Sequence, residues 1–378
     1  MQNTFHIFGS GGIGQAAILL LETCFQGSIY HVYDLRFDNM NAYFITLDKD
    51  LTYRIHHHLI NMDKDHSNLH IDGDFVLDCM PGHISPLVAK IAVENKIGYI
   101  NLTEYVNETN QIVEMSKGYK SSAIVVQSGV APGFVNILGK SLVERIKETN
   151  RASTFENLEM MVGAISSDAK APYFYAFTWS PIGVATEYLK SSNIVKDHQL
   201  VKVPSLGEIT PHIINGQIYD CAPTSGGIAD MAEVYAPMIK NMSYQTIRYQ
   251  GHFQWVKNLI QQQGISDPKV LLVEMEKLIP FVEDDKIIIY SRLDYLNAEQ
   301  KLHSISKDYE VLPAQFFGVK LRAIQIATAI PMVATIDWVL QNGVEGLVTQ
   351  SSIDTEFLMK HPLVLDYFEK SPMEKVCV

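Results

Sequence analysis

Three glycines near the start of the chain have a spacing that suits binding of a dinucleotide. Residues 4–8 form a short apolar run, and Gly9, Gly11 and Gly14 follow in the pattern G-x-G-x-x-G. In such a loop the first glycine permits a tight turn, the second lets the backbone approach a pyrophosphate, and the third lets helix and strand pack closely. The following helix would offer its free N–H groups to the phosphates. We therefore predict loop contacts to a dinucleotide from Gly9, Ser10, Gly11, Gly12, Ile13 and Gly14.

An acidic residue completes this pattern at the end of the next apolar run. Residues 28–33 lead into Asp34, which lies about 20 residues past the last glycine, where a carboxylate accepts the ribose hydroxyls. That carboxylate would repel the 2′-phosphate of NADP, so the pattern predicts NAD. The positive charge of Arg36 could neutralise such a phosphate, so NADP is the alternative cofactor. The alternative interpretation of the motif is a glycine-rich turn without a ligand.

The elements that must position this loop are strands alternating with helices. Strand patterns follow at residues 57–62, 75–80, 99–102 and 123–127, and helical patterns lie between them at 85–95 and 108–118. Alternating elements with short connections are typical of a parallel, doubly wound sheet. We predict an α/β fold in which residues 1–132 form a Rossmann dinucleotide-binding domain.

The pattern changes after Gly133. Strand-like segments separated by irregular loops occur at residues 158–165, 199–203, 216–221, 244–248 and 286–292, with helical patterns at 251–263 and 268–278. This predicts an inserted α+β domain with a mixed sheet over residues 133–320. Residues 321–340 form one apolar helix that must be covered on most sides, so we expect segment 321–350 to return to the Rossmann domain. Residues 351–378 are expected to form a C-terminal tail.

Charge and composition exclude several classes of protein. The 378-residue chain has a formal net charge of -12, which disfavours a nucleic-acid partner. Its cysteines show no C-x-x-C spacing, and no basic segment precedes the first strand, so we expect a cytoplasmic protein without a signal peptide. Residues 323–340 contain Pro331 and Asp337, and we interpret them as a buried helix rather than a membrane span.

Two further patterns resemble known binding sites but lack the residues or the spacing that those sites require. His56, His57 and His58, together with His66 and His70, suggest a metal, yet adjacent strand residues point to opposite faces and no acid or cysteine follows at a ligand spacing. We therefore predict no metal site. The stretch from Gly133 to Lys140 resembles a phosphate-binding P-loop, but its glycines stand one residue too far apart.

Several loop motifs together resemble one enzyme family. They are Asp78-Cys-Met-Pro-Gly82, Gly129-Val-Ala-Pro-Gly133, Phe177-Thr-Trp-Ser-Pro181, Ala222-Pro-Thr-Ser-Gly-Gly227 and Thr246-Ile-Arg-Tyr-Gln-Gly-His252. In this order they resemble the saccharopine dehydrogenase-like oxidoreductases, over residues 4 to about 340. That family includes saccharopine reductase, L-lysine 6-dehydrogenase and carboxynorspermidine dehydrogenase. The resemblance implies a Rossmann domain, an inserted dimerising domain, and NAD(P)-dependent oxidation or reduction of a carbon–nitrogen bond in an amino acid or amine.

The motifs look closest to the lysine dehydrogenase branch. In the saccharopine reductase branch an aspartate usually stands where this chain has Ala131, and an arginine that holds a substrate carboxylate occurs where this chain has Thr224 and Ser225. A reductase of polyamine metabolism is the alternative within the family. A non-catalytic dinucleotide-binding regulator is the alternative outside it.

Residues at the carboxyl ends of the first sheet are candidates for proton transfer and cofactor contact, since ligands of open α/β sheets bind there. His83 has a suitable intrinsic pKa for an acid or base, and Glu104 stands on the next loop. A solvent-facing histidine and a solvated carboxylate are the alternatives. Further cofactor contacts are expected from Met80, Pro81, Gly82 and Gly129.

Arg248 is the predicted anchor of the substrate carboxylate, because the family's usual arginine is missing at Thr224 and Ser225. Thr224 and Ser225 could add hydroxyl and backbone donors, and His252 stands beside the same corner. Trp179 could form a pocket wall. The alternatives are an ion pair for Arg248, a plain turn for residues 224–227, and a core position for Trp179.

Overall fold

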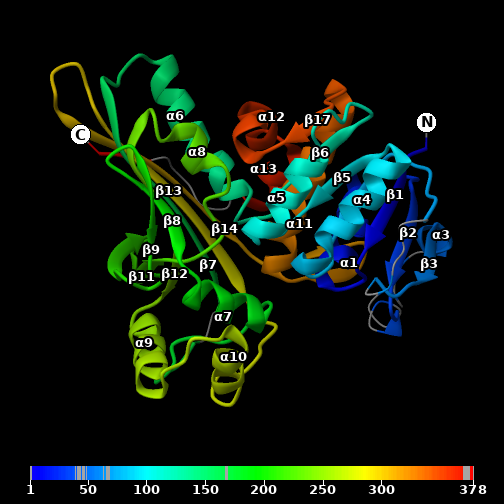
Figure 1. Ribbon diagram of the computed structural model, residues 1–378, viewed down its shortest axis with the longest axis horizontal. Helices are drawn as coiled ribbons and strands as arrows, with labels where there is room; N and C mark the ends of the chain where they lie inside the picture. Colours follow the sequence, from blue (N-terminus) through cyan, green and yellow to red (C-terminus); the bar gives the residue numbers. More distant parts are fainter. Residues whose placement is uncertain are drawn as a thin grey trace. The chain divides into compact units, whose positions relative to one another are not determined.

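The computed structural model describes residues 2–38, 40, 44, 47, 49–62, 64, 69–166, 169–368 and 375–377 (Figure 1). His66 lies outside these described residues. The chain forms two compact units. The first comprises Met1–Phe134, Pro313–Leu321 and Gln325–Val364, and the second comprises Val135–Leu312, Arg322–Ile324 and Leu365–Val378.

The first unit is built on a parallel sheet, which confirms the predicted Rossmann fold. Within the described residues its seven strands run in the order β17-β6-β5-β4-β1-β2-β3. Their bounds are β1 Thr4–Phe8, β2 Ile29–Asp34, β3 Ile55–Leu59, β4 Phe75–Asp78, β5 Gly98–Asn101, β6 Ala123–Val125 and β17 Gly346–Val348. The strand order reverses between β1 and β4, so this is the topological switch point at which such sheets bind ligands.

Short helices connect these strands. They are α1 Gly12–Cys24, α3 Lys49–Tyr53, η1 Gly82–Ile84, α4 Ser85–Asn95 and α5 Val106–Met115 (Figure 1). Every residue of β4 is buried, as expected for a central parallel strand. The edge strand β3 is the main correction to the predicted boundaries, because it pairs with β2 over Ile55–Leu59 rather than over residues 57–62. Its three consecutive histidines show no apolar period from which its ends could be predicted.

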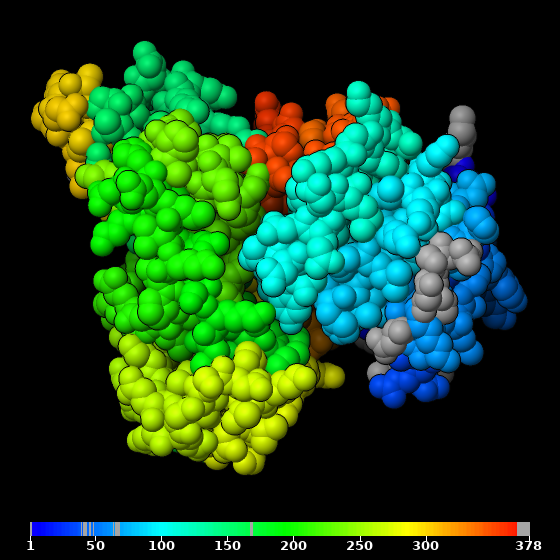
Figure 2. Space-filling model, viewed as in Figure 1, coloured from blue at the N-terminus to red at the C-terminus, as the bar shows by residue number. Residues whose placement is uncertain are grey.

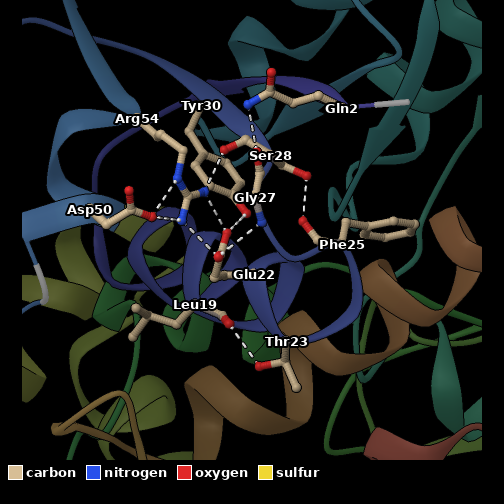
Figure 3. A network of polar contacts seen from close by, with 10 residues as sticks. All are labelled: Gln2, Leu19, Glu22, Thr23, Phe25, Gly27, Ser28, Tyr30, Asp50 and Arg54. Carbon is tan, nitrogen blue, oxygen red and sulfur yellow. Dashed lines mark hydrogen bonds and ion pairs between the residues drawn. The ribbon is translucent and has the colours of Figure 1, made fainter.

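A polar network fixes the start of β2 against the end of α1 (Figure 3). Glu22, whose side chain is 5% exposed, accepts hydrogen bonds from both terminal nitrogens of Arg54 at 2.8 Å. The hydroxyl of Tyr30 donates to the same carboxylate at 2.9 Å. Burial opposes ionisation of Glu22, but these donors outweigh it and lower its pKa. The network therefore holds together the strand–helix–strand unit that carries the glycine loop.

The second unit confirms the predicted α+β domain with a mixed sheet. Its strand order is β10-β11-β12-β7-β13-β14-β18, with the hairpin β8–β9 also joined to β12. The β12–β7 pair is parallel and its neighbours are antiparallel. The bounds are β7 Thr154–Ile165, β8 Ser192–Lys196, β9 Gln199–Val203, β10 Thr210–Ile214, β11 Gln217–Pro223, β12 Ile239–Tyr249, β13 Lys286–Leu296, β14 Leu302–Val311 and β18 Lys375–Cys377.

The helices of the second unit are α6 Phe134–Glu148, α7 Pro181–Leu189, α8 Met231–Tyr235, α9 His252–Gln263 and α10 Pro268–Glu276. Apolar side chains of α7, α9 and α10 form one buried cluster that includes Val184, Phe253 and Leu271. Figure 2 shows α9 and α10 as a continuous yellow lobe. These helices cover the side of β12 on which Arg248 lies, since Tyr188 of α7 and His252 of α9 belong to the same hydrogen-bonded group as that arginine.

The long apolar helix is α11, Ala323–Asn342, and most of it belongs to the first unit. It is long and apolar enough to span a membrane by length and composition, but 72% of its most apolar window is buried inside the protein. Gln325 donates to the carbonyl of Gly12 at 2.7 Å, and Ser128 donates to Thr335 at 3.1 Å. Within the unit, α11 therefore contacts both the glycine loop and the loop after β6.

The C-terminal residues are more ordered than the predicted tail. They form η2 Gln350–Ser352, α12 Thr355–Met359 and α13 Pro362–Phe368, followed by β18 on the edge of β14. A separate hairpin, β15 Ala314–Phe316 with β16 Val319–Leu321, precedes α11. These elements are short, and their apolar residues do not repeat often enough to reveal a helical period.

Candidate functional site

The glycine loop has the geometry that its spacing predicts. Gly9 has a φ of 100°, and a Cβ there would lie 2.7 Å from the carbonyl oxygen of Cys79. A Cβ on Gly14 would lie 2.0 Å from the carbonyl oxygen of Gly9. Around Gly11, in contrast, no atom lies within 4 Å of where a Cβ would be. Gly9 and Gly14 are therefore required by packing, whereas Gly11 leaves open space at the position where a pyrophosphate would approach.

The start of α1 offers donors to that open space. Gly11 is the N-cap and provides no side chain to satisfy the first helical N–H groups, among them those of Gly12 and Ile13. The first turn contains no acidic residue that would repel a phosphate. The carbonyl of Ser10 accepts a hydrogen bond from the buried Gln15 side chain at 2.8 Å, which fixes the loop. A dinucleotide pyrophosphate fits this arrangement of backbone donors and positive helix end.

Asp34 lies against the loop rather than apart from it. One carboxylate oxygen accepts from the backbone N–H of Ser10 at 2.7 Å and from its hydroxyl at 2.8 Å. The other accepts from the N–H of Leu35 at 2.6 Å. Asp34 therefore fixes the loop in addition to its predicted role at the ribose. Arg36 is exposed, and within the described residues its guanidinium makes no hydrogen bond or ion pair.

A buried polar network lies beneath the carboxyl ends of β4, β5 and β6. Asp78 accepts from the N–H of Met80 at 3.0 Å and from the hydroxyl of Tyr99 at 2.8 Å. Asn101 donates to the Tyr99 hydroxyl at 3.1 Å and accepts from the N–H of Gln127 at 2.8 Å. Burial raises the pKa of Asp78 to about 6, although its hydrogen-bond donors oppose that rise. This network positions the loops after β4 and β6.

The structure brings the two predicted proton-transfer residues onto adjacent loops. A Cβ on Gly82 would lie 2.4 Å from the hydroxyl oxygen of Thr103, so the loop after β4 packs against the loop after β5. His83 is exposed beside Pro81, and Glu104 is partly buried next to Thr103. Gly129 belongs to the third loop, where its carbonyl accepts from the N–H of Phe134 at 2.8 Å. All these residues therefore lie at the carboxyl ends of the strands.

Arg248 is the centre of a buried hydrogen-bond chain in the second unit. Its side chain is 1% exposed, its Nε donates to the hydroxyl of Tyr188 at 2.8 Å, and its Nη1 donates to the carbonyl of Ile247 at 2.9 Å. The Tyr188 hydroxyl lies 3.0 Å from Nε2 of His252, and Nδ1 of His252 lies 2.8 Å from the carbonyl oxygen of Tyr173. Because a carbonyl can only accept, Nδ1 carries the proton and Tyr188 donates to Nε2. Burial and the charge of Arg248 lower the pKa of His252 to about 3, so this histidine is neutral.

Burial opposes the charge of Arg248, but Tyr188, Tyr175 and the buried carboxylate of Glu187 outweigh burial and raise the pKa of the guanidinium. Within the described residues no ion pair involves Arg248, and no hydrogen bond uses its Nη2. The guanidinium carbon instead lies 4.7 Å from the centre of the Tyr175 ring. A guanidinium has five N–H donors, and two are used here. The remaining donors could hold an anion.

The other predicted substrate residues have structural partners. The hydroxyls of Thr224 and Thr246 lie 2.6 Å apart in the core, and Thr246 shares with Arg248 one face of β12. The N–H of Ser225 donates to the carbonyl of Glu187 at 3.4 Å. Trp179 packs against Gly183 of α7 within the apolar cluster. The structure thus groups Arg248, His252 and Thr224 on one side of the sheet of the second unit.

Sequence reasoning missed Tyr188 and the network residues Asp78, Tyr99 and Asn101. The available signal was a polar residue at the end of two apolar strands, Asp78 after β4 and Asn101 after β5. Among the histidines, His31 Nδ1 and His58 Nε2 lie 2.9 Å apart, whereas His57 stacks on Phe37 from the other face. In the described part of the chain no three His, Cys, Asp or Glu residues are arranged to hold a metal ion.

Two family models together match nearly the whole chain. Residues 5–127 match the saccharopine dehydrogenase NADP binding domain, and residues 129–361 match the saccharopine dehydrogenase C-terminal domain. The chain belongs to the saccharopine dehydrogenase family. The predicted resemblance is therefore confirmed, and the dinucleotide bound by the glycine loop is a nicotinamide cofactor.

Curated relatives of this family member are distant. The chain is 24% identical to the mitochondrial alpha-aminoadipic semialdehyde synthase of Bos taurus over 214 residues, which is 54% of this chain and 22% of that protein. It is 24% identical to saccharopine dehydrogenase [NADP(+), L-glutamate-forming] of Saccharomyces cerevisiae over 203 residues, 52% of this chain and 45% of that protein. The matches thus span less than half the length of these relatives.

Two solved structures share the fold. Apo saccharopine dehydrogenase (L-Glu forming) from Saccharomyces cerevisiae matches with a TM-score of 0.74 and 15% identity, covering 100% of both chains. A homospermidine synthase from Legionella pneumophila, in complex with NAD, matches with a TM-score of 0.69 and 12% identity, covering 98% of this chain and 90% of that one. At such identities the likeness concerns the fold.

Proposed function

We propose that the protein is an NAD(P)-dependent oxidoreductase that acts on the C–N bond of an amino acid, of the L-lysine 6-dehydrogenase or saccharopine dehydrogenase type. The observation that carries the proposal is Arg248, a buried guanidinium that forms no direct ion pair within the described residues, although the charge of Glu187 acts on it. A buried charge is costly unless it is paired, and a substrate carboxylate would supply a counter-charge that is hydrogen-bonded directly to the guanidinium. Membership of the saccharopine dehydrogenase family supports the same conclusion.

The predicted residues would divide the chemistry among cofactor binding, substrate binding and proton transfer. The glycine loop binds the dinucleotide, which accepts or donates a hydride at the carbon that bears nitrogen. Arg248 holds the substrate carboxylate through its free donors, and Tyr188 and His252 keep the guanidinium in place. His83 or Glu104 accepts the proton from the substrate amine during oxidation, and water then attacks the resulting imine.

We also propose NAD as the preferred cofactor, since the Asp34 carboxylate lies beside the loop residue Ser10 and would repel a 2′-phosphate. The relative from Saccharomyces cerevisiae is named for NADP(+), and the exposed Arg36 is the residue that could favour that cofactor here. We further propose that the protein is a homodimer in the cytoplasm. It would act on a small molecule and bind neither nucleic acid nor a membrane. Light scattering on the purified protein measures its molar mass in solution, and a value of two chains would support the homodimer.

Replacing Arg248 with Met tests the carboxylate anchor, because methionine fills the buried site but donates no hydrogen bond. We expect KM for the amino acid to rise about ten- to a hundredfold, since hydrogen bonds to charged groups contribute about 1.5–3 kcal/mol. The dissociation constant of the cofactor should not change. An unchanged KM together with a lower melting temperature would instead make Arg248 a structural residue of the Tyr188–His252 chain.

A substrate screen separates this proposal from its alternative. The alternative is a reductase of polyamine metabolism. The fold that this chain shares with a homospermidine synthase supports that alternative. Turnover of NADH or NADPH is measured with lysine, with saccharopine, and with a diamine plus an aldehyde. Turnover with the diamine pair alone would replace our proposal by the alternative, and no turnover with any amine would indicate a non-catalytic dinucleotide-binding protein.

A further inference from the structure

One residue just past the carboxyl end of β6 has an uncommon backbone conformation. Gln127 has a φ of 63°, in the left-handed region that residues with a side chain rarely adopt. Within the described part of the first unit only two other non-glycine residues, Lys96 and Phe317, have a positive φ, and both are exposed at turns. Gln127 is buried, with 7% of its surface exposed. Its conformation therefore has a cause in the surrounding structure.

That cause is Asn101, which is fully buried at the end of β5. Its side-chain oxygen accepts from the N–H of Gln127 at 2.8 Å, and its backbone carbonyl accepts from the N–H of Ser128 at 2.8 Å. The side-chain nitrogen of Asn101 donates to the Tyr99 hydroxyl at 3.1 Å, which fixes the asparagine itself. Both peptide groups that flank Gln127 are thus held by the end of the neighbouring strand, which imposes the left-handed turn.

The side chain of Gln127 takes no part in holding this turn. Within the described residues its amide makes no hydrogen bond, because only its backbone N–H is used. The buried glutamines Gln15, Gln325 and Gln350 of the same unit differ, since each donates to a backbone carbonyl at 2.7–2.9 Å. A buried amide that forms no hydrogen bond is unfavourable, and a strained backbone is typical of ligand sites. We therefore expect a ligand group at this amide.

The strand order indicates which part of the cofactor lies there. In the order β6-β5-β4-β1-β2, the strands β6 and β2 stand on opposite sides of β1, which leads into the glycine loop. Asp34 at the end of β2 is expected at the adenosine ribose, so the other half of the dinucleotide would extend over the ends of β4, β5 and β6. Neighbouring strands are about 4.8 Å apart, so three spacings separate β6 from β1 by roughly 14 Å. Gln127 therefore lies where the nicotinamide is expected, beyond the pyrophosphate.

We propose that the side-chain amide of Gln127 pairs with the carboxamide of the nicotinamide, donating one hydrogen bond and accepting another. The two groups are complementary, because each has an acceptor oxygen and N–H donors. Such a pair fixes the rotation of the nicotinamide ring, so that one face of the ring is presented to the substrate. The proposal deepens the proposed oxidoreductase function and rests on it for the cofactor alone, not for the substrate.

A cycle of two ligands and two proteins tests the proposal, by titration calorimetry of the full chain without substrate. The ligands are NADH and its reduced 3-acetylpyridine analogue, in which a methyl group replaces the amide nitrogen. The proteins are the wild type and Gln127→Leu. We expect the preference for NADH over the analogue to be about three- to tenfold smaller in Gln127→Leu, which is the effect of one neutral hydrogen bond. Differences between the ligands that do not involve Gln127 cancel in this comparison.

Two further variants separate cofactor binding from effects on the fold. Gln127→Gly suits the left-handed backbone, so it serves if leucine disturbs the fold, and it should lose the same preference. Gln300→Leu is the matched control, because Gln300 has a φ of 61° but is exposed between β13 and β14. This control should bind both ligands as the wild-type protein does.

Two results would overturn the proposal. Equal weakening of both ligands would mean that Gln127 only shapes the loop. An unchanged preference for NADH in Gln127→Leu and Gln127→Gly, shown to be folded by circular dichroism, would mean that the amide does not contact the carboxamide. The nicotinamide is common to NADH and NADPH, and neither a substrate nor Arg248 takes part in the test. Failure of the proposed substrate or of the proposed NAD preference would therefore leave its outcome unaffected.

Discussion

Replacing Asp78 with Asn should change how the stability of the first unit depends on pH. The Asp78 side chain is fully enclosed at the end of β4, and burial raises its pKa from 3.8 to about 6. Asparagine has nearly the same shape and can still accept from the N–H of Met80, but it has no charge to bury. The Tyr99 hydroxyl, which donates to Asp78, can turn its proton toward the carbonyl of Ser85 at 3.3 Å.

The magnitude follows from the difference between the two pKa values. A carboxyl group that is protonated more readily in the folded state stabilises the fold at low pH, and this contribution is lost as pH rises through the folded pKa. A shift of roughly 2 units at about 1.36 kcal/mol per unit corresponds to about 3 kcal/mol. Relative to Asp78→Asn, the wild-type free energy of unfolding should therefore fall by about 3 kcal/mol between about pH 4 and pH 6.5.

Urea unfolding of both proteins at a series of pH values measures this difference. Contributions of all other titrating groups cancel in the comparison, and any constant cost of the altered hydrogen bonds moves the variant curve without changing its slope. Glu345→Gln, an exposed carboxylate of the same unit, is the control and should give a profile parallel to the wild type. Parallel profiles for Asp78→Asn, within about 0.5 kcal/mol, would refute the assignment of a costly buried charge at this position.

Other predictions concern the cofactor and the long helix. Gly11→Ala should fold normally but lose affinity for NADH. Gly14→Ala should destabilise the first unit, because its Cβ would lie 2.0 Å from the carbonyl oxygen of Gly9. Equal effects of the two substitutions on the melting temperature would contradict this. Titration of both cofactors should show tighter binding of NADH than of NADPH, and the reverse order would disprove the role given to Asp34. Truncation after about residue 320 removes α11 and β17 and should unfold the dinucleotide-binding unit, which a truncated protein of unchanged NADH affinity would disprove.

The sequence by itself determined the dinucleotide-binding fold and the family. A tight turn, a close phosphate approach and a close helix contact each restrict the residue type within a few positions, so Gly9, Gly11 and Gly14 are informative without any tertiary contact. Alternating strand and helix patterns likewise predicted the parallel sheet, and the β-like segments after Gly133 predicted a mixed sheet. These signals are local, because they come from backbone conformation and the period of apolar residues.

Tertiary structure alone decided which polar residues meet. Tyr188 and His252 are separated by 64 residues, yet their side chains lie 3.0 Å apart, and Tyr188, fixed by this contact, accepts from Arg248. Asp78, Tyr99 and Asn101 come from successive strands and become a network only because parallel strands end at the same edge of the sheet. Such groupings depend on strand order and register over long sequence separations, which a local pattern does not contain.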